Sequence, residues 1–207
     1  MKTQQYNALF VICVSGFTQH AGYFHGILKL REQLLDAGFA NGSHQRVIYL
    51  TWKADFHRVA QELSIVCNHQ GFKPAVVLAG YSYGGWGAIQ LASQLERVGI
   101  DVFSLVLSDP VGRQWWWPRP LPAITSMLGR NNAFKLDVPA NVHRCVSFYQ
   151  TVNRPQGHQL RPANGTKMVE PVQLAVTHQR MDDAEQFHQA VLAEANSASE
   201  CVYKEAA

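Results

Sequence analysis

The sequence predicts an α/β fold, a three-layer sandwich in which about six mostly parallel strands lie between helices. Short runs of apolar and β-branched residues alternate with amphipathic stretches of helical length, which is typical of a parallel sheet. With 207 residues, 47% of them hydrophobic, the chain is long enough to bury a sizeable core. No repeat or linker divides the sequence, so residues 1–207 are predicted to form one domain.

The predicted elements follow from these patterns. Strands are expected at 8–15, 46–51, 75–81, 102–108, 142–149 and 172–177. Helices are expected at 23–37, 55–69, 86–98 and 182–195. Ile27, Leu30 and Leu34 have helical spacing, and Asp182 lies where it would cap the last helix.

The connection after the fourth strand is long and differs in composition from the others. Residues 112–140 include Trp115, Trp116, Trp117 and three prolines. Long structured insertions often act as lids or binding loops. Either this insertion is such a lid, with Trp115 and Trp116 lining a pocket, or its tryptophans fasten an irregular loop to the sheet.

Charge and cysteine content narrow the classes of protein. The net charge is +3, but residues 113–169 hold eight Lys or Arg and one acid, whereas the following residues are acidic. Such a basic region is either solvated surface or a site for an anionic partner. Cys13 and Cys145 lie in predicted strands and no CxxC spacing occurs, so we expect buried free thiols in a reducing compartment and no metal.

The apolar run near the N-terminus is too short to span a bilayer and lacks a cleavage pattern of small residues, so it is interpreted as the first strand. No integral membrane association and a cytoplasmic location are therefore expected.

The most informative motif is Gly80-Tyr81-Ser82-Tyr83-Gly84-Gly85, between a predicted strand and a predicted helix. A phosphate-binding P-loop would carry a lysine at the helix start, and a dinucleotide fingerprint needs the spacing G-x-G-x-x-G. Neither is present. Small residues two before and two after a serine permit a tight strand-to-helix turn that exposes its hydroxyl.

This motif resembles the nucleophile elbow of the α/β-hydrolase superfamily, and the resemblance extends over nearly the whole chain. It implies that Ser82 is a nucleophile and that the base is a histidine between the last strand and the last helix. His178 occupies that place. The other candidates are less well placed: His188 on the surface of the last helix, His143 at the opposite end of the sheet, His158 in a loop beyond the fifth strand, and His20 and His25 beside the first turn.

In the commonest arrangement of the superfamily, the acid follows the strand before the histidine strand, which here is the strand at 142–149. No Asp or Glu occurs from 139 to 169. Asp109 ends the strand before it, at the edge where ligands bind in open α/β sheets, and some members of the superfamily take their acid from there. Asp109 is therefore the predicted acid. Two alternatives remain: Asp109 only forms a turn before Pro110, or Gln150 or Asn153 orients His178.

The resemblance also implies an oxyanion hole formed by backbone N–H groups of Phe17 and Tyr83. Thr18, His20, Tyr81, Trp115 and Trp116 are the predicted pocket residues. The function expected is a serine hydrolase, without a cofactor, that cleaves an ester or thioester carrying an apolar group. Two alternatives are an inactive relative that binds a ligand or partner, and a binder of nucleic acid or membrane surface; binding to nucleic acid is not expected.

Overall fold

The protein is described here by a computed structural model, which covers residues 6–40, 44–112, 130 and 134–203. Most of the predicted insertion at 112–140, with Trp115 and Trp116, lies outside the described residues. Its role as a lid therefore stays a prediction.

A seven-stranded sheet forms the centre of the molecule, in the order β2-β1-β3-β4-β6-β8, with β9 also beside β6. Every pairing in it is parallel. Its strands are β1 (Ala8–Val14), β2 (Gln45–Leu50), β3 (Pro74–Tyr81), β4 (Val102–Ser108), β6 (Val142–Tyr149), β8 (Lys167–Met168) and β9 (Val172–Gln173). β5 (Lys135–Val138) and β7 (Gln159–Pro162) form a separate parallel pair.

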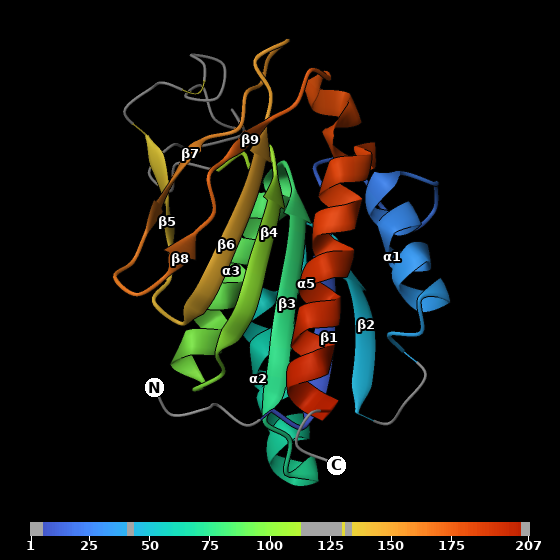
Figure 1. Ribbon diagram of the computed structural model, residues 1–207, viewed down its shortest axis with the longest axis vertical. Coiled ribbons are helices and arrows are strands. Elements are labelled where there is room, and N and C mark those ends of the chain that lie inside the picture. Colours follow the sequence, from blue (N-terminus) through green and yellow to red (C-terminus); the bar gives the residue numbers. More distant parts are fainter. Residues whose placement is uncertain (1–5, 41–43, 113–129, 131–133, 204–207) are drawn as a thin grey trace.

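Helices cover both faces of the sheet (Figure 1). They are α1 (Gly26–Asp36), α2 (Phe56–Gln70), α3 (Tyr83–Arg97), a 3₁₀ helix (His178–Asp183) and α5 (Glu185–Tyr203). Along β1, Leu9 and Val11 pack in one core with α1 and α5, and Phe10 and Ile12 pack in the other with α2 and α3. Because both faces of β1 are covered, all its residues are buried, and each fully buried aliphatic side chain contributes about 2 kcal/mol. The predicted three-layer α/β fold is confirmed.

The register of the sheet brings the carboxyl ends of four strands to one edge. Val14 of β1 lies opposite Gly80 of β3, Gly80 opposite Leu107 of β4, and Leu107 opposite Ser147 of β6. The loops that follow these strands therefore meet, as expected for the ligand-binding edge of an open parallel sheet.

Five of the predicted strands are present with bounds that differ by no more than a residue, whereas the sixth was wrong. Of residues 172–177 only Val172–Gln173 pair with the sheet. Both are exposed, and Leu174 then turns into the core, so the chain leaves the sheet edge at once. β5, β7 and β8 were not predicted, because they are short and partly exposed.

The helix boundaries also differ. α1 begins at Gly26 rather than residue 23, because His25 is still extended (φ −152°, ψ 170°), and α3 begins directly after Ser82. The prediction that Asp182 caps the last helix was wrong. Asp182 lies in the 3₁₀ helix, and its Oδ2 accepts the N–H of Gly26, the first residue of α1.

Cys13, Cys67 and Cys145 are buried free thiols, as predicted for Cys13 and Cys145, whereas Cys201 is exposed. Within the part of the chain described, no helix is both long and apolar enough to cross a bilayer.

Candidate active site

Ser82 lies at a sharp turn between β3 and α3. Its φ of 52° is a left-handed value that non-glycine residues rarely adopt. The strand fixes this conformation, because the Ser82 N–H donates to the carbonyl of Ser108 at the end of β4 (3.0 Å) and the Ser82 carbonyl accepts from Val111 (2.9 Å). The strained strand-to-helix turn expected at this position is therefore present.

The glycines around Ser82 permit three close backbone contacts. A Cβ at Gly80 would lie 2.5 Å from the Gly84 carbonyl oxygen, one at Gly84 would overlap the carbonyls that end β1, and one at Gly85 would lie 2.8 Å from the Cβ of Pro110. A side chain at any of these positions would push α3 away from the sheet.

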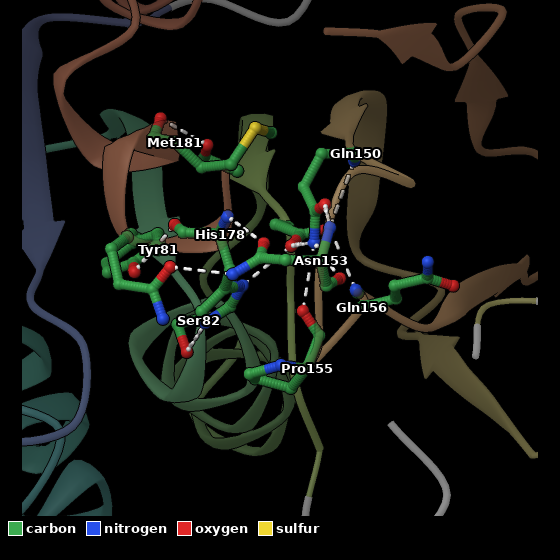
Figure 2. Close-up of polar contacts among 12 residues, drawn as sticks. Tyr81, Ser82, Gln150, Asn153, Pro155, Gln156, His178 and Met181 are labelled. Atoms are coloured by element: carbon green, nitrogen blue, oxygen red, sulfur yellow. Dashed lines mark hydrogen bonds and ion pairs between the residues drawn. The ribbon is translucent and has the colours of Figure 1, made fainter. Parts of the chain in front are cut away.

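His178 is the first residue of the 3₁₀ helix and is buried. Its Nε2 lies 2.9 Å from Ser82 Oγ. Two side chains fix its backbone: Tyr81 Oη donates to the His178 carbonyl (2.9 Å), and Asn153 Oδ1 accepts from the His178 N–H (2.7 Å). Figure 2 shows the imidazole between Tyr81 and Ser82 on one side and Asn153 on the other. Burial raises the pKa of Tyr81, so its hydroxyl remains a donor.

Asp109 follows β4 and is fully buried. Its Oδ2 lies 2.6 Å from His178 Nδ1, so the structure brings Ser82, His178 and Asp109 into one hydrogen-bonded row. Asp109 also has a positive φ of 45°.

The carboxylate of Asp109 has donors on both oxygens. Oδ1 accepts from the N–H groups of Gly157 (2.8 Å) and Gln150 (3.3 Å), and Oδ2 accepts from the Gln150 side-chain amide (3.0 Å) as well as from His178. Of the two alternative partners for the His178 ring, Gln150 donates its side-chain amide to Asp109, and Asn153 accepts the backbone N–H of His178. Gly157 approaches so closely that a Cβ there would lie 2.5 Å from Asp109 Oδ1.

These contacts fix the tautomer of His178. Every group around Asp109 is a donor, so the carboxylate requires a proton on Nδ1. Nε2 is then the unprotonated nitrogen and accepts the Ser82 hydroxyl. In this arrangement Nε2 can take the proton of Ser82, and Asp109 can stabilise the imidazolium that forms.

The turn after β1 lies beside this row. Phe17 and Thr18 both line the same pocket as Ser82 and His178, and Gly16 is packed so that a Cβ would lie 2.7 Å from the Tyr81 ring. The turn is closed by the N–H of Gln19, which donates to the Gly16 carbonyl (3.1 Å). The predicted oxyanion donors, the N–H groups of Phe17 and Tyr83, thus belong to residues that line this pocket.

A pocket of about 370 Å³ opens over Ser82. Its walls are mainly aromatic and apolar; the lining residues are Phe17, Thr18, Gln19, Tyr23, Tyr81, Ser82, Tyr83, Val111, Pro155, His178 and Gln179. Two of the predicted pocket residues, Thr18 and Tyr81, are among them. His20 does not, because its ring lies against Tyr23 on the exposed surface. Trp115 and Trp116 lie outside the described residues.

Aromatic rings form one wall of the pocket. The ring centroid of Phe17 lies 5.0 Å from Trp52 and 5.9 Å from Tyr83. Phe17 is 50% exposed, although its ring is large and apolar. This side of the pocket therefore offers apolar surface to a bound group.

The other histidines have different surroundings. His188 was expected on the surface but is buried, with Nδ1 2.8 Å from Gln33 Oε1 and Nε2 2.7 Å from the Asp182 carbonyl. His158 is buried behind Pro110, and its Nδ1 accepts from the Gly112 N–H (3.1 Å). Burial lowers the pKa of His158 to about 4, so this ring stays neutral.

Several residues near the row were not predicted. Gly157 donates its N–H to Asp109, and Gln19 donates its side-chain amide to Asp182. The partners in each contact are far apart in the sequence, so no spacing pattern points to them. Tyr23 had a signal, since it is an aromatic residue shortly after the first turn. Among the described residues, no group of three or more His, Cys, Asp or Glu side chains is arranged to hold a metal ion.

No family model and no curated protein matches this sequence. Solved structures are similar in fold. The RedJ thioesterase from the prodiginine biosynthetic pathway in Streptomyces coelicolor has a TM-score of 0.50 and 10% identity, over 91% of this chain and 85% of that one.

Two further structures have lower scores. The YbtT type II thioesterase from the yersiniabactin NRPS/PKS pathway has a TM-score of 0.47 and 12% identity, over 93% and 94% of the two chains. A structure from Xanthomonas campestris pv. campestris, assigned to the alpha/beta hydrolase superfamily, has a TM-score of 0.43 and 16% identity, over 95% and 99%. The chain has the α/β-hydrolase fold, as predicted.

Proposed function

We propose that this protein is a serine hydrolase that cleaves an ester or thioester through an acyl-enzyme on Ser82. The observation that supports it best is the row of contacts from Ser82 Oγ to His178 Nε2 (2.9 Å) and from His178 Nδ1 to Asp109 Oδ2 (2.6 Å) at the base of an apolar pocket. A nucleophile, a base in the required tautomer and a buried carboxylate are what acyl transfer needs.

In the proposed reaction, His178 Nε2 takes the proton of Ser82 Oγ as the oxygen attacks the carbonyl carbon of the substrate. The tetrahedral oxyanion is stabilised by the N–H groups of Phe17 and Tyr83. His178 then gives its proton to the leaving oxygen or sulfur, and the acyl group remains on Ser82. Water, deprotonated by His178, attacks this ester, and the acid is released as Ser82 regains its proton.

The pocket supports an apolar acyl or aromatic group as the part of the substrate that is held. Phe17, Tyr83 and Val111 present carbon surface to the space above Ser82. RedJ, which has the same fold, is named as a thioesterase. This supports a thioester as one of the two bonds in the proposed substrate class.

A test is labelling with a fluorophosphonate, which forms a covalent bond only to an activated serine. We expect one labelled site at Ser82 and none in Ser82→Ala, while Ser197→Ala, on the exposed side of α5, labels normally. Hydrolysis of p-nitrophenyl butyrate and of a butyryl thioester, followed by absorbance, should fall by at least about 10⁴-fold in Ser82→Ala. Labelling that persists in Ser82→Ala would refute the proposal.

The alternative of an inactive ligand-binding relative rested on the missing acid after the fifth strand. Asp109 lies within hydrogen-bond distance of His178, so that reason no longer favours it. The basic region is a weak argument for nucleic acid or membrane surface, because Arg144 and Arg161 are paired with Glu194 and Asp137. A folded protein that neither labels nor hydrolyses would favour binding.

A further inference from the structure

The turn that follows β1 is closed by its own glutamine. Gln19 donates its backbone N–H to the Gly16 carbonyl (3.1 Å), and its side-chain Oε1 accepts the Gly16 N–H (2.9 Å). Thr18, between them, has a positive φ of 66°. The turn thus has a backbone conformation that is unfavourable for its own residues. The hydrogen bond from Gly16 to the Gln19 side chain helps to stabilise it.

The other end of the Gln19 side chain reaches a segment far along the chain. Its Nε2 donates to Asp182 Oδ2 at 2.7 Å, and the same oxygen accepts the N–H of Gly26 at 2.8 Å. Asp182 is only 3% exposed. The two ends of the amide are assigned unambiguously, because the Gly16 N–H requires an oxygen and the Asp182 carboxylate requires a donor.

Asp182 is itself held firmly. Its carbonyl accepts from His188 Nε2 (2.7 Å), and α1 packs so closely that a Cβ at Gly26 would overlap that carbonyl group. Ser108 Oγ also donates to the carbonyl of Met181 (2.7 Å), which fixes the 3₁₀ helix to the end of β4. The surrounding structure therefore holds the Asp182 carboxylate, which Gln19 contacts, in one position.

Asp182 lies on the 3₁₀ helix whose first residue is His178. The Gln19 side chain consequently joins the turn that carries Phe17 to the helix that carries the proposed base. We propose that Gln19 and Asp182 are positioning residues. They hold the Phe17 N–H where it can donate to the oxyanion, and they keep it at a fixed position relative to His178. This inference rests on the proposed function.

The expected size follows from how strongly acyl transfer depends on geometry. Loss of one oxyanion donor costs about 10²–10³ in kcat, and a displacement of about 1 Å costs about 10². Displacing a donor without removing it should therefore lower kcat by about 30- to 100-fold. The KM should change less than kcat, because the Phe17 ring is also held by its contacts with Trp52 and Tyr83, which are not part of this turn.

The decisive variant is Gln19→Glu, which keeps an acceptor for Gly16 but places a second carboxylate against Asp182. We expect kcat for p-nitrophenyl butyrate to fall about 30- to 100-fold with KM within about threefold. Affinity for a trifluoromethyl ketone, whose adduct with Ser82 carries an oxyanion, should fall in parallel. Asp182→Asn gives no clean rescue of this variant, because the oxygen that faces position 19 also accepts the Gly26 N–H, and an NH₂ in its place would face that donor.

Asp183→Asn is the matched control. Asp183 is the neighbouring carboxylate and pairs with Lys29 and Arg180 at the surface, without contact to Gln19. Its kcat should stay within about twofold of wild type. Gln19→Met, of similar length but without polar ends, gives an independent measurement if Gln19→Glu does not fold.

The outcomes are distinct. If a folded Gln19→Glu or Gln19→Met keeps kcat within threefold, the positioning role is refuted while the proposed function stands. If the wild type neither labels at Ser82 nor hydrolyses the ester, the proposed function is refuted, and the positioning role with it.

Discussion

Replacing Asp109 by asparagine tests the proposed row of Ser82, His178 and Asp109 at the member whose place in the fold, after β4, is the least usual. Each carboxylate oxygen faces two donors: Oδ1 faces the N–H groups of Gln150 and Gly157, and Oδ2 faces His178 Nδ1 and the Gln150 amide. An asparagine has to place its own NH₂ against one of these pairs.

The His178 side is the one that can adapt. The donors at Oδ1 are backbone groups and cannot turn around. The Gln150 amide is also fixed, because its Nε2 donates to the carbonyls of Asn153 and Pro155 and its Oε1 accepts from the Asn153 N–H. His178 can instead move its proton to Nε2, so that Nδ1 accepts from the asparagine. Nε2 would then face Ser82 with a proton and could not act as the base.

The wrong tautomer in a serine protease triad lowers kcat by about 10⁴. We expect about the same here, which corresponds to about 5.4 kcal/mol at 1.36 kcal/mol per tenfold. Unfolding free energy should also fall by about 1–3 kcal/mol, because a buried donor loses its full partner.

The assay is ester hydrolysis and fluorophosphonate labelling, with urea unfolding on the same preparation. Asp137→Asn removes an exposed carboxylate paired with Arg161 and should leave kcat within about twofold. A folded Asp109→Asn that keeps more than a tenth of the wild-type kcat would refute this reasoning and leave Asp109 as a structural turn residue.

Three further predictions concern stability and reactivity. Burial lowers the pKa of His158 from 6.5 to about 4, so the unfolded chain takes up the proton first as pH falls; relative to His158→Asn, the wild type should lose about 2 kcal/mol of unfolding free energy between pH 7.5 and pH 5 in urea titrations. Gly84→Ala should lower stability by at least about 3 kcal/mol through overlap with the end of β1, whereas Gly99→Ala, with φ 74° and open space, should cost about 1 kcal/mol; equal losses would contradict the overlap. In native protein a thiol reagent should modify Cys201 alone at first, and modification of all four cysteines should require denaturant.

The sequence predicted the part of the molecule that depends on local pattern. β1, β3 and β4 are nearly continuous buried runs, and such runs are visible in one sequence because both faces are apolar. The turn at Ser82 is visible because its glycines occupy fixed positions. Asp109 was selected because no other acid lies near the correct strand ends, and the structure places it beside His178.

The rest could not be predicted because it depends on contacts between distant segments. Asp182 contacts Gly26 and Gln19 from the other end of the chain, so it was interpreted as a helix cap for its own neighbours. His188 has an ordinary helical position in sequence, yet it is covered by α1 through Gln33. The segment 172–177 is rich in apolar and β-branched residues, but it lies at a sheet edge, where little packing holds a strand.

The positions of backbone strain limit how the protein can be made more heat-resistant. Within the described residues, the non-glycine residues with positive φ are Thr18, Ser82 and Asp109, and all three follow strands at the carboxyl edge of the sheet. Each costs about 1–3 kcal/mol, against about 5–15 kcal/mol of net stability for a typical domain. Selection for survival at high temperature alone would favour glycine or asparagine at these three positions and would erode the proposed chemistry. Stabilising changes should therefore be sought at the opposite end of the sheet, where the loops before β3 and β4 carry none of this strain.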